Sequence, residues 1–303
     1  MTFTTKDGLH LHVRTDGPDD APVTVLLAHC WTADLELWRY QVRDLRAAFG
    51  DGVRVVRYDH RGHGRSDATP EQDATIDNLA RDLSDLIDQL VPTGPIVLGG
   101  HSIGGMTIMA LAARRPELFT ERVVGVLFVS TSSGRLDRVT LGLPERVRDL
   151  IPPMLAMRSR MVGRRRRRSA PAIESTIVRR FLFGSPMRAA DHRLAVDSLI
   201  NTPAASMSGF FHDLMRHDRA DALAVLRGTP VHVVVGEQDR LTPLSHHRRL
   251  VAQMPWARLT VAPGAGHMLP LERDRVVSDA LLGLARQQVG VLAPGAEDAD
   301  IAV

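Results

Sequence analysis

The sequence predicts an α/β protein with a doubly wound, mostly parallel sheet. Three observations lead to this prediction: apolar runs of strand length recur along the chain, helical segments separate them, and strand and helix alternate regularly. A parallel strand that helices cover on both faces reads as a continuous apolar run, as residues 23–28 and 123–129 do. The alternation favours one sheet with helices on both of its faces.

The expected elements follow in a simple order. Residues 9–13 alternate between polar and apolar, and the Asp7-Gly8 turn before them predicts an edge hairpin with residues 2–5. The further strands are expected at residues 23–28, 53–58, 96–100, 123–129, 231–235 and 258–261. The helices that separate them are expected at residues 35–49, 77–90, 102–115 and 243–254.

The alternation stops for about ninety residues in the middle of the chain. Residues 132–221 contain helical stretches and prolines but no clear buried strand, which predicts a helical lid inserted into the core. The core would then consist of residues 1–131 and 222–290, and residues 291–303 would form a disordered tail. Methionines recur in the insertion, where they either line an adaptable apolar pocket or simply fill a core: Met154, Met157, Met161, Met187, Met207 and Met215.

Composition sets the class of protein. The chain has 303 residues, of which 44% are hydrophobic and 24% charged, as is typical of a globular protein. No apolar stretch approaches the roughly 18 residues that a membrane span needs, so no integral membrane segment is expected. The N-terminus has no signal-peptide pattern, and Cys30 is the only cysteine, so we expect no internal disulfide and a cytoplasmic location.

The charge pattern argues against a polyanion-binding protein. The net charge is +3, Lys6 is the only lysine, and arginines and acids are mixed along most of the chain, so no nucleic-acid partner is expected. Residues 164–168 are an exception, because they are five consecutive arginines. This run is interpreted as a solvated loop, with an anionic membrane or an acidic partner as the alternative.

One motif sits at the end of an expected strand. Gly100, Ser102 and Gly104 form the pattern GxSxG between an apolar run and a helical segment, which is typical of a nucleophile elbow. The turn is so tight that side chains two residues before and after the serine would clash. It lifts the serine hydroxyl above the sheet and directs the N–H of Ile103 to the position where an oxyanion would form.

A second loop follows the expected strand at 53–58. Residues 59–66 contain two glycines and several hydrogen-bonding side chains, which suits a tightly braced turn, so this loop is interpreted as scaffolding. His60 and His63 suggest a metal site, but no pattern of further ligands completes one. No metal and no cofactor are therefore expected.

Together these motifs resemble the α/β-hydrolase superfamily, in which the elbow is followed in chain order by an acid loop and a histidine loop. Residues 236–243 resemble the acid loop, with Asp239 as the acid, and residues 264–268 resemble the histidine loop, with His267. Residues 29–32 resemble the oxyanion loop and residues 59–66 the DxRGxGxS turn. Glu237 is a reserve acid, and Asp137 is a second one.

The resemblance implies a chemistry of acyl transfer. Ser102 would attack a carbonyl carbon, and His267 would remove the hydroxyl proton and return it to the leaving group. Asp239 would hold His267 in the required tautomer, and the backbone N–H groups of Trp31 and Ile103 would bind the oxyanion.

The substrate class is less constrained than the chemistry. A serine at the elbow makes the aspartate-based dehalogenases and epoxide hydrolases of the superfamily improbable relatives. The lid is rich in flexible apolar side chains and the chain has few aromatic residues, which favours apolar carboxylic esters. Thioester, lactone or C–C bond hydrolysis and cofactor-free perhydrolysis are alternatives, as is a receptor-like protein that binds a ligand without turnover. The oligomeric state is left open.

Cys30 departs from the superfamily pattern, which usually has glycine after the histidine of the oxyanion loop. Cysteine is small and apolar enough to fill the position, and we expect the turn to form with an ordinary φ there. The alternative is a second nucleophile, which would need a neighbour that stabilises its thiolate.

Overall fold

The computed structural model describes residues 1–138, 172–184 and 186–292. Its strands are β1 (Thr2–Thr4), β2 (His10–Asp16), β3 (Val23–Ala28), β4 (Val53–Tyr58), β5 (Ile96–His101), β6 (Val123–Val129), β7 (Val231–Gly236) and β8 (Arg258–Ala262). They form one sheet of eight strands in the order β1-β2-β4-β3-β5-β6-β7-β8. The predicted doubly wound, mostly parallel α/β sheet is confirmed.

The pairing of the strands follows the sequence pattern. β1 and β2 pair antiparallel with Phe3 opposite Leu11, as the hairpin signal predicted, and β2 pairs antiparallel with β4. Every later pair in the sheet, from β4–β3 through to β7–β8, is parallel. The carboxyl ends of β3, β5, β6, β7 and β8 therefore meet at one edge, where ligand-binding loops of open α/β sheets lie.

Successive side chains of the central strands enter two different cores. In β3, Leu26 and Ala28 belong to one buried cluster, whereas Val25 and Leu27 belong to the other. The first cluster also contains the buried faces of α2 (Ile76–Leu90) and α3 (Ile103–Arg114), and the second those of α1 (Arg39–Phe49) and α12 (Asp274–Leu292). The strand period of two thus explains why these runs are apolar throughout.

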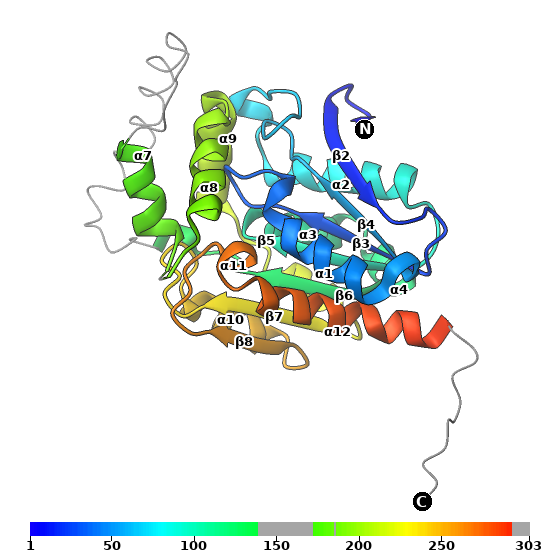
Figure 1. Cartoon of the computed structure of the whole chain (residues 1–303). Coiled ribbons are helices and arrows are strands. Elements are labelled where there is room, and N and C mark those ends of the chain that lie inside the picture. Colours follow the sequence, from blue (N-terminus) through cyan, green and yellow to red (C-terminus); the bar gives the residue numbers. More distant parts are fainter. Residues whose placement is uncertain (139–171, 185, 293–303) are drawn as a thin grey trace, which may run out of the picture.

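The predicted helices are found within a few residues of their expected positions. The first predicted helix divides into a 3₁₀ turn, η1 (Leu35–Trp38), and α1, and Thr75 caps α2 by accepting a hydrogen bond from Asn78 N–H at 3.2 Å. The helix α12 was not predicted from the sequence, and it runs along the sheet (Figure 1). The remaining helices outside the insertion are η2 (Gly50–Gly52), η3 (Glu71–Asp73), α4 (Pro116–Glu121), η6 (Asp221–Leu226), α10 (Leu244–Gln253) and α11 (Leu269–Glu272).

The described part of the predicted insertion is helical. It contains η4 (Leu136–Arg138), α7 (Ala172–Ile177), the π-helical turn η5 (Val178–Leu182), α8 (Ala189–Asn201) and α9 (Ala204–Arg216). Figure 1 shows α7, α8 and α9 gathered at one end of the sheet. There Ser198 of α8 donates a hydrogen bond to Asp34, which follows β3, and Ser206 of α9 donates one to the carbonyl of Thr69, which follows β4. The loops at the carboxyl edge therefore contact this segment.

Several features predicted from the sequence fall partly or wholly outside the described residues. The arginine run at 164–168 and Met154, Met157 and Met161 lie outside them, as do residues 293–303 of the predicted tail. Met207 is buried, and Met187 and Met215 are partly buried against the two cores. Among the described helices none is both long and apolar enough to cross a membrane.

Candidate active site

Ser102 lies in the sharp turn between β5 and α3. Its φ of 54° and ψ of −115° are unusual for a residue with a side chain. A Cβ atom at Gly100 would lie 2.5 Å from the Gly104 carbonyl carbon, and one at Gly104 would overlap the carbonyl oxygen of Ala28 in β3. The first turn of α3 thus approaches β5 too closely for a side chain at Gly100, and it approaches β3 too closely for one at Gly104.

The backbone of Ser102 is held from two sides by hydrogen bonds. Ser102 N–H donates to the Val129 carbonyl at 2.9 Å, and the Thr131 hydroxyl donates to the Ser102 carbonyl at 2.7 Å. No sequence pattern predicts that Thr131 holds the turn at Ser102, because Thr131 follows β6 whereas Ser102 follows β5. Within the described ranges, the Ser102 hydroxyl makes no hydrogen bond. Hydrogen bonds between catalytic groups are often long in an enzyme without bound substrate and shorten when substrate binds.

Asp239 and His267 are in direct contact although 28 residues separate them. The ring Nδ1 of His267 lies 2.9 Å from Oδ2 and 3.1 Å from Oδ1 of Asp239, and both residues are buried. The carboxylate also accepts hydrogen bonds at 2.9 Å from the N–H groups of Leu241 and Thr242 and from the Thr242 hydroxyl. With the carboxylate as acceptor, Nδ1 carries the proton and Nε2 is left to act as a base.

The electrostatics keep Asp239 ionised. Burial alone would raise its pKa, but the attraction of His267, the hydrogen bond from that ring and the N–H of Thr242 outweigh burial and lower the pKa to about 2. At neutral pH a negative charge therefore lies beside His267. A carboxylate held ionised beside a histidine ring is the arrangement that a serine-based catalytic triad requires.

His267 is brought beside the elbow through His101, the residue before Ser102. His101 Nε2 donates a hydrogen bond to the His267 carbonyl at 2.8 Å, and the two ring centroids are 4.9 Å apart. Burial and the neighbouring His267 lower the pKa of His101 to about 3, so it stays neutral. Sequence reasoning missed this contact, since the position between Gly100 and Ser102 is variable in the motif.

The two backbone N–H groups that the sequence predicts as oxyanion donors have no acceptor within the part of the chain that the structure covers. One belongs to Ile103, the first residue of α3, where helix N–H groups lack an intrahelical partner. The other belongs to Trp31 in the loop after β3. Such free donors are suited to bind an oxyanion.

The loop after β3 forms without a positive φ at Cys30. The residue of this loop with a positive φ is Thr32, at 58°. Cys30 is buried, and desolvation raises the pKa of its thiol far above the usual range. A thiolate is thereby strongly disfavoured, so the structure favours packing over nucleophilic chemistry for Cys30.

His29, in the loop after β3, forms a buried cluster of rings with His60 and His63. The centroids of His29 and His60 are 4.3 Å apart, and those of His29 and His63 are 5.4 Å apart. His60 N–H donates to His29 Nε2 at 2.8 Å, and His60 Nε2 donates to the His29 carbonyl at 2.9 Å. Hydrogen bonds with backbone groups thus use both ring nitrogens of His29 and one ring nitrogen of His60. No set of metal ligands is found among the described residues.

Asp59 braces the turn that carries these histidines. Its two carboxylate oxygens accept hydrogen bonds from Leu35 N–H at 2.7 Å and Arg65 N–H at 2.8 Å. Arg61 of the same turn forms a buried bidentate ion pair with Asp82 of α2, with contacts of 2.6 and 2.7 Å. These contacts support the interpretation of residues 59–66 as scaffolding.

The two reserve acids lie in other surroundings. Glu237 is exposed and accepts a hydrogen bond from Gly264 N–H at 2.9 Å. Asp137 is exposed in η4. Asp239 is the carboxylate that contacts the His267 ring.

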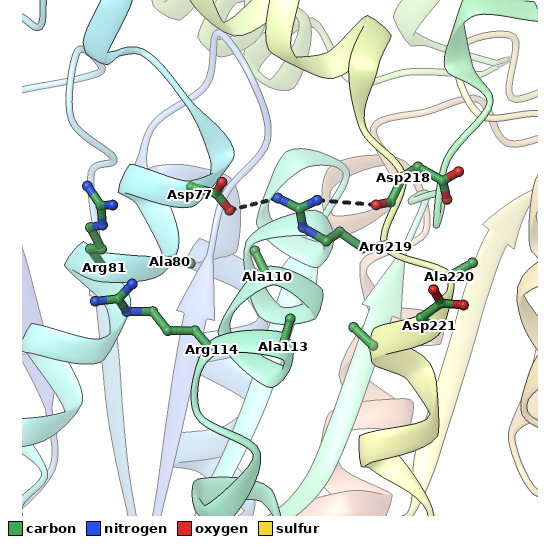
Figure 2. Close-up of a pocket in the computed structure, with 11 residues that line it drawn as sticks. Asp77, Ala80, Arg81, Ala110, Ala113, Arg114, Asp218, Arg219, Ala220 and Asp221 are labelled. Atoms are coloured by element: carbon green, nitrogen blue, oxygen red, sulfur yellow. Dashed lines mark hydrogen bonds and ion pairs between the residues drawn. The ribbon is translucent and has the colours of Figure 1, made fainter.

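A separate pocket of about 690 Å³ lies between α2, α3 and η6. Figure 2 shows its alanines together with charged side chains of both signs, and Arg219 bridges the pocket by pairing with Asp77 at 2.8 Å. No serine, threonine, cysteine or histidine is among the described residues that line this pocket, so we do not assign catalysis to it.

Comparison with known proteins agrees with this geometry. The profile of the alpha/beta hydrolase family matches residues 25–280. The chain is 25% identical over 288 residues to the bifunctional esterase/perhydrolase DCH of Acinetobacter calcoaceticus, covering 93% of this chain and 98% of that protein.

Comparison with solved structures also finds proteins that share this fold. A thermophilic esterase from Thermogutta terrifontis is 26% identical and superposes with a TM-score of 0.74 over 95% of this chain and 98% of its own. The enol-lactonase from Burkholderia xenovorans LB400 shares the fold, with 24% identity and a TM-score of 0.72 over 94% of this chain and 100% of its own. With its sheet, its elbow and a family match over most of its length, the chain belongs to the alpha/beta hydrolase family and is a hydrolase.

Proposed function

We propose that this hydrolase cleaves apolar carboxylic esters through Ser102, His267 and Asp239. The observation that carries the proposal is the buried contact of 2.9 Å between His267 Nδ1 and Asp239 Oδ2, beside the strained turn at Ser102. Neutral serine is a weak nucleophile, so it needs an adjacent base whose tautomer is set by a third group. These three residues supply that arrangement.

In the first half of the reaction, Ser102 Oγ forms a bond to the ester carbonyl carbon while its proton passes to His267 Nε2. The carbonyl oxygen becomes negative and accepts hydrogen bonds from the N–H groups of Trp31 and Ile103. The intermediate then collapses, and the alcohol leaves with the proton from His267. Loss of one oxyanion donor typically costs about 10²- to 10³-fold in turnover.

The second half repeats these steps with water. His267 takes a proton from the water as its oxygen attacks the acyl-enzyme carbonyl carbon. The same N–H groups stabilise the second oxyanion, and Ser102 leaves with the proton that His267 held. The products are a carboxylic acid and free enzyme.

The side chains near the proposed oxyanion site support the proposal that the acyl group of the substrate is apolar. The Trp31 ring lies 6.0 Å from the ring of Phe211 in α9, measured between centroids. The residue that offers one oxyanion donor therefore carries a large apolar side chain next to a helix of the insertion. Burial of each substrate methylene there contributes up to about 0.8 kcal/mol.

The nucleophile is tested with Ser102→Ala and a matched control, Ser245→Ala, at an exposed serine of α10. Triad members act as a unit, so Ser102→Ala should lose about 10⁴-fold or more in turnover of an activated ester, and Ser245→Ala should be unaffected. A fluorophosphonate probe should label Ser102 in the wild type, as located by mass spectrometry. Wild-type turnover by folded Ser102→Ala, with contamination excluded, would disprove the triad.

The substrate class is tested with p-nitrophenyl esters from acetate to laurate. We expect kcat/KM to rise several-fold per added carbon and then to level off or fall once the pocket is filled. A flat series would argue against an apolar acyl pocket. Absence of turnover together with ligand binding would favour the receptor-like alternative.

Perhydrolysis is a second candidate, favoured by the resemblance over 93% of this chain to a bifunctional esterase/perhydrolase. Here hydrogen peroxide rather than water attacks the acyl-enzyme, and the product is a peracid. The assay combines acetate, hydrogen peroxide and an oxidisable reporter. Peracid formation that depends on Ser102 would support it.

A further inference from the structure

Glu272, the last residue of α11, binds the backbone on both sides of His267. Its carboxylate accepts hydrogen bonds from Gly266 N–H at 3.0 and 3.1 Å and from Met268 N–H at 3.0 Å. Bonds from N–H groups to a charged acceptor are stronger than those between neutral groups. The histidine loop is thus held by one side chain whose hydrogen bonds among the described residues are to backbone N–H groups.

The same carboxylate joins this loop to the segment that follows η5. Glu272 also accepts a hydrogen bond from Gly184 N–H at 2.6 Å. Nearby, the Leu182 carbonyl accepts hydrogen bonds from His267 N–H at 2.8 Å and Met268 N–H at 3.1 Å. Residues 182–184, the histidine loop and Glu272 therefore form one closed network of hydrogen bonds.

The packing within this network leaves little room for adjustment. A Cβ atom at Gly266 would lie 2.5 Å from the nitrogen of Gly184, and one at Gly184 would overlap the carbonyl oxygen of Gly264. Two backbones in such close contact cannot slide past each other without breaking the bonds to Glu272. The position of His267 is thus coupled to residues 182–184.

We propose that Glu272 is a positioning residue for the reaction: its carboxylate holds the backbone of His267 against residues 182–184 and thereby sets the distance from His267 Nε2 to Ser102. The inference rests on the proposed role of His267 as the base. A displacement of about 1 Å in a catalytic group can cost about 10²-fold in rate. The effect should therefore appear in kcat rather than in KM.

Glu272→Gln is the variant that tests this. Glutamine has the same shape, but its NH₂ group cannot accept a hydrogen bond, and backbone N–H groups face both oxygens of Glu272. In either orientation of the glutamine amide, its NH₂ group therefore faces a backbone N–H group. These two groups are both donors, so they cannot form a hydrogen bond. We expect kcat for a p-nitrophenyl ester to fall about 10- to 100-fold, with KM within about twofold of the wild type.

The matched control is Glu237→Gln. Glu237 also accepts a hydrogen bond from the histidine loop, at Gly264 N–H, but it is exposed and does not flank His267. Its kcat should stay within about twofold of the wild type. The contrast between the two variants separates the position next to His267 from any general need for a carboxylate on this loop.

Two further measurements keep the inference falsifiable. If Glu272→Gln does not fold, Glu272→Asp, which keeps the charge but is one methylene shorter, should show the loss in kcat. The NMR signal of the His267 Nδ1 proton should shift or broaden in the Glu272 variant and not in the Glu237 variant, a readout that is independent of turnover. Wild-type kcat and an unshifted signal in a folded Glu272 variant would overturn the inference, whereas ester turnover by Ser102→Ala would overturn the proposed function.

Discussion

Unusual backbone conformations gather at the edge of the sheet where the candidate site lies. Thr32, Ser102 and Ser130 follow β3, β5 and β6, and their φ values are 58°, 54° and 45°. A residue with a side chain held in this region costs on the order of 1–3 kcal/mol, which the surrounding contacts must offset. At Ser102 those contacts are the hydrogen bonds with Val129 and Thr131. The strain thus lies where the loops must present specific groups.

At the residue scale, Cys30→Ala distinguishes packing from thiol chemistry. Because burial raises the pKa of Cys30 far above neutrality, the thiolate should be scarce, and the variant should keep activity within about threefold of the wild type. Initial rates on a p-nitrophenyl ester measure this. A loss of more than about 10³-fold in a variant with unchanged circular dichroism would instead indicate a direct role, since it exceeds the typical cost of one oxyanion donor.

At the scale of elements, the packing of α3 against β3 depends on a residue without a side chain. Gly104, the second residue of α3, lies so close to Ala28 that a Cβ atom would overlap the backbone of the strand. At Gly283, in the middle of α12, an added Cβ atom would have nothing within 4 Å. The two glycines therefore offer a matched pair with opposite expectations.

We expect Gly104→Ala to lower the free energy of unfolding by at least about 2 kcal/mol, because helix and strand must move apart. Gly283→Ala should raise it by about 0.5–1 kcal/mol, since alanine loses less backbone entropy in a helix than glycine. Urea denaturation of both variants and the wild type measures the two effects. If Gly104→Ala were as stable as Gly283→Ala, the close approach of α3 to β3 would be wrong.

At the scale of the whole molecule, the fold keeps many titratable groups neutral in its interior. Burial is the main cause that lowers the pKa of five buried histidines: to about 3 for His60 and His101, and to about 4 for His63, His217 and His247. Burial also raises the pKa of two carboxyl groups, Asp59 and Asp82, to about 6. Protons therefore bind the folded and unfolded chains differently in mildly acidic solution.

The histidines should make the protein less stable as the pH falls from about 6.5 to about 4. In this window the unfolded chain takes up protons at imidazoles that the folded chain keeps neutral, and each such proton lowers the free energy of unfolding by about 1.4 kcal/mol per pH unit. Asp59 and Asp82 act in the opposite sense, because the folded chain protonates them first. Burial also lowers the pKa of His29 and raises that of Glu272, so six buried histidines oppose three carboxyl groups and the net effect should be acid destabilisation.

Urea denaturation at pH 7, 6 and 5 measures this dependence. The variant His217→Gln, which removes one of these imidazoles, should have a smaller pH slope than the wild type. Equal stability at pH 7 and pH 5, or greater stability at pH 5, would contradict the neutral buried histidines.

Much of the fold could be read from the sequence because local patterns carry it. The run at β3 is apolar throughout because its alternate side chains enter two cores, so its position and parallel pairing were predictable. The elbow at Ser102 was predictable for a similar reason, since glycine on either side is a local requirement. The long helix α12 was missed, although it covers one face of the sheet.

The sequence by itself determined the order of the strands and of the helices between them, the motif at Ser102 and the candidates Asp239 and His267, which remain a proposal as a triad. Only the tertiary structure decided which carboxylate contacts the His267 ring, because Asp239 and Glu237 are two residues apart and differ in direction rather than in chemistry. It also revealed the bracing by His101 and Glu272. Hydrogen bonds between distant backbone and side-chain groups leave no periodic trace in a sequence, so their partners become known only when the chain is folded.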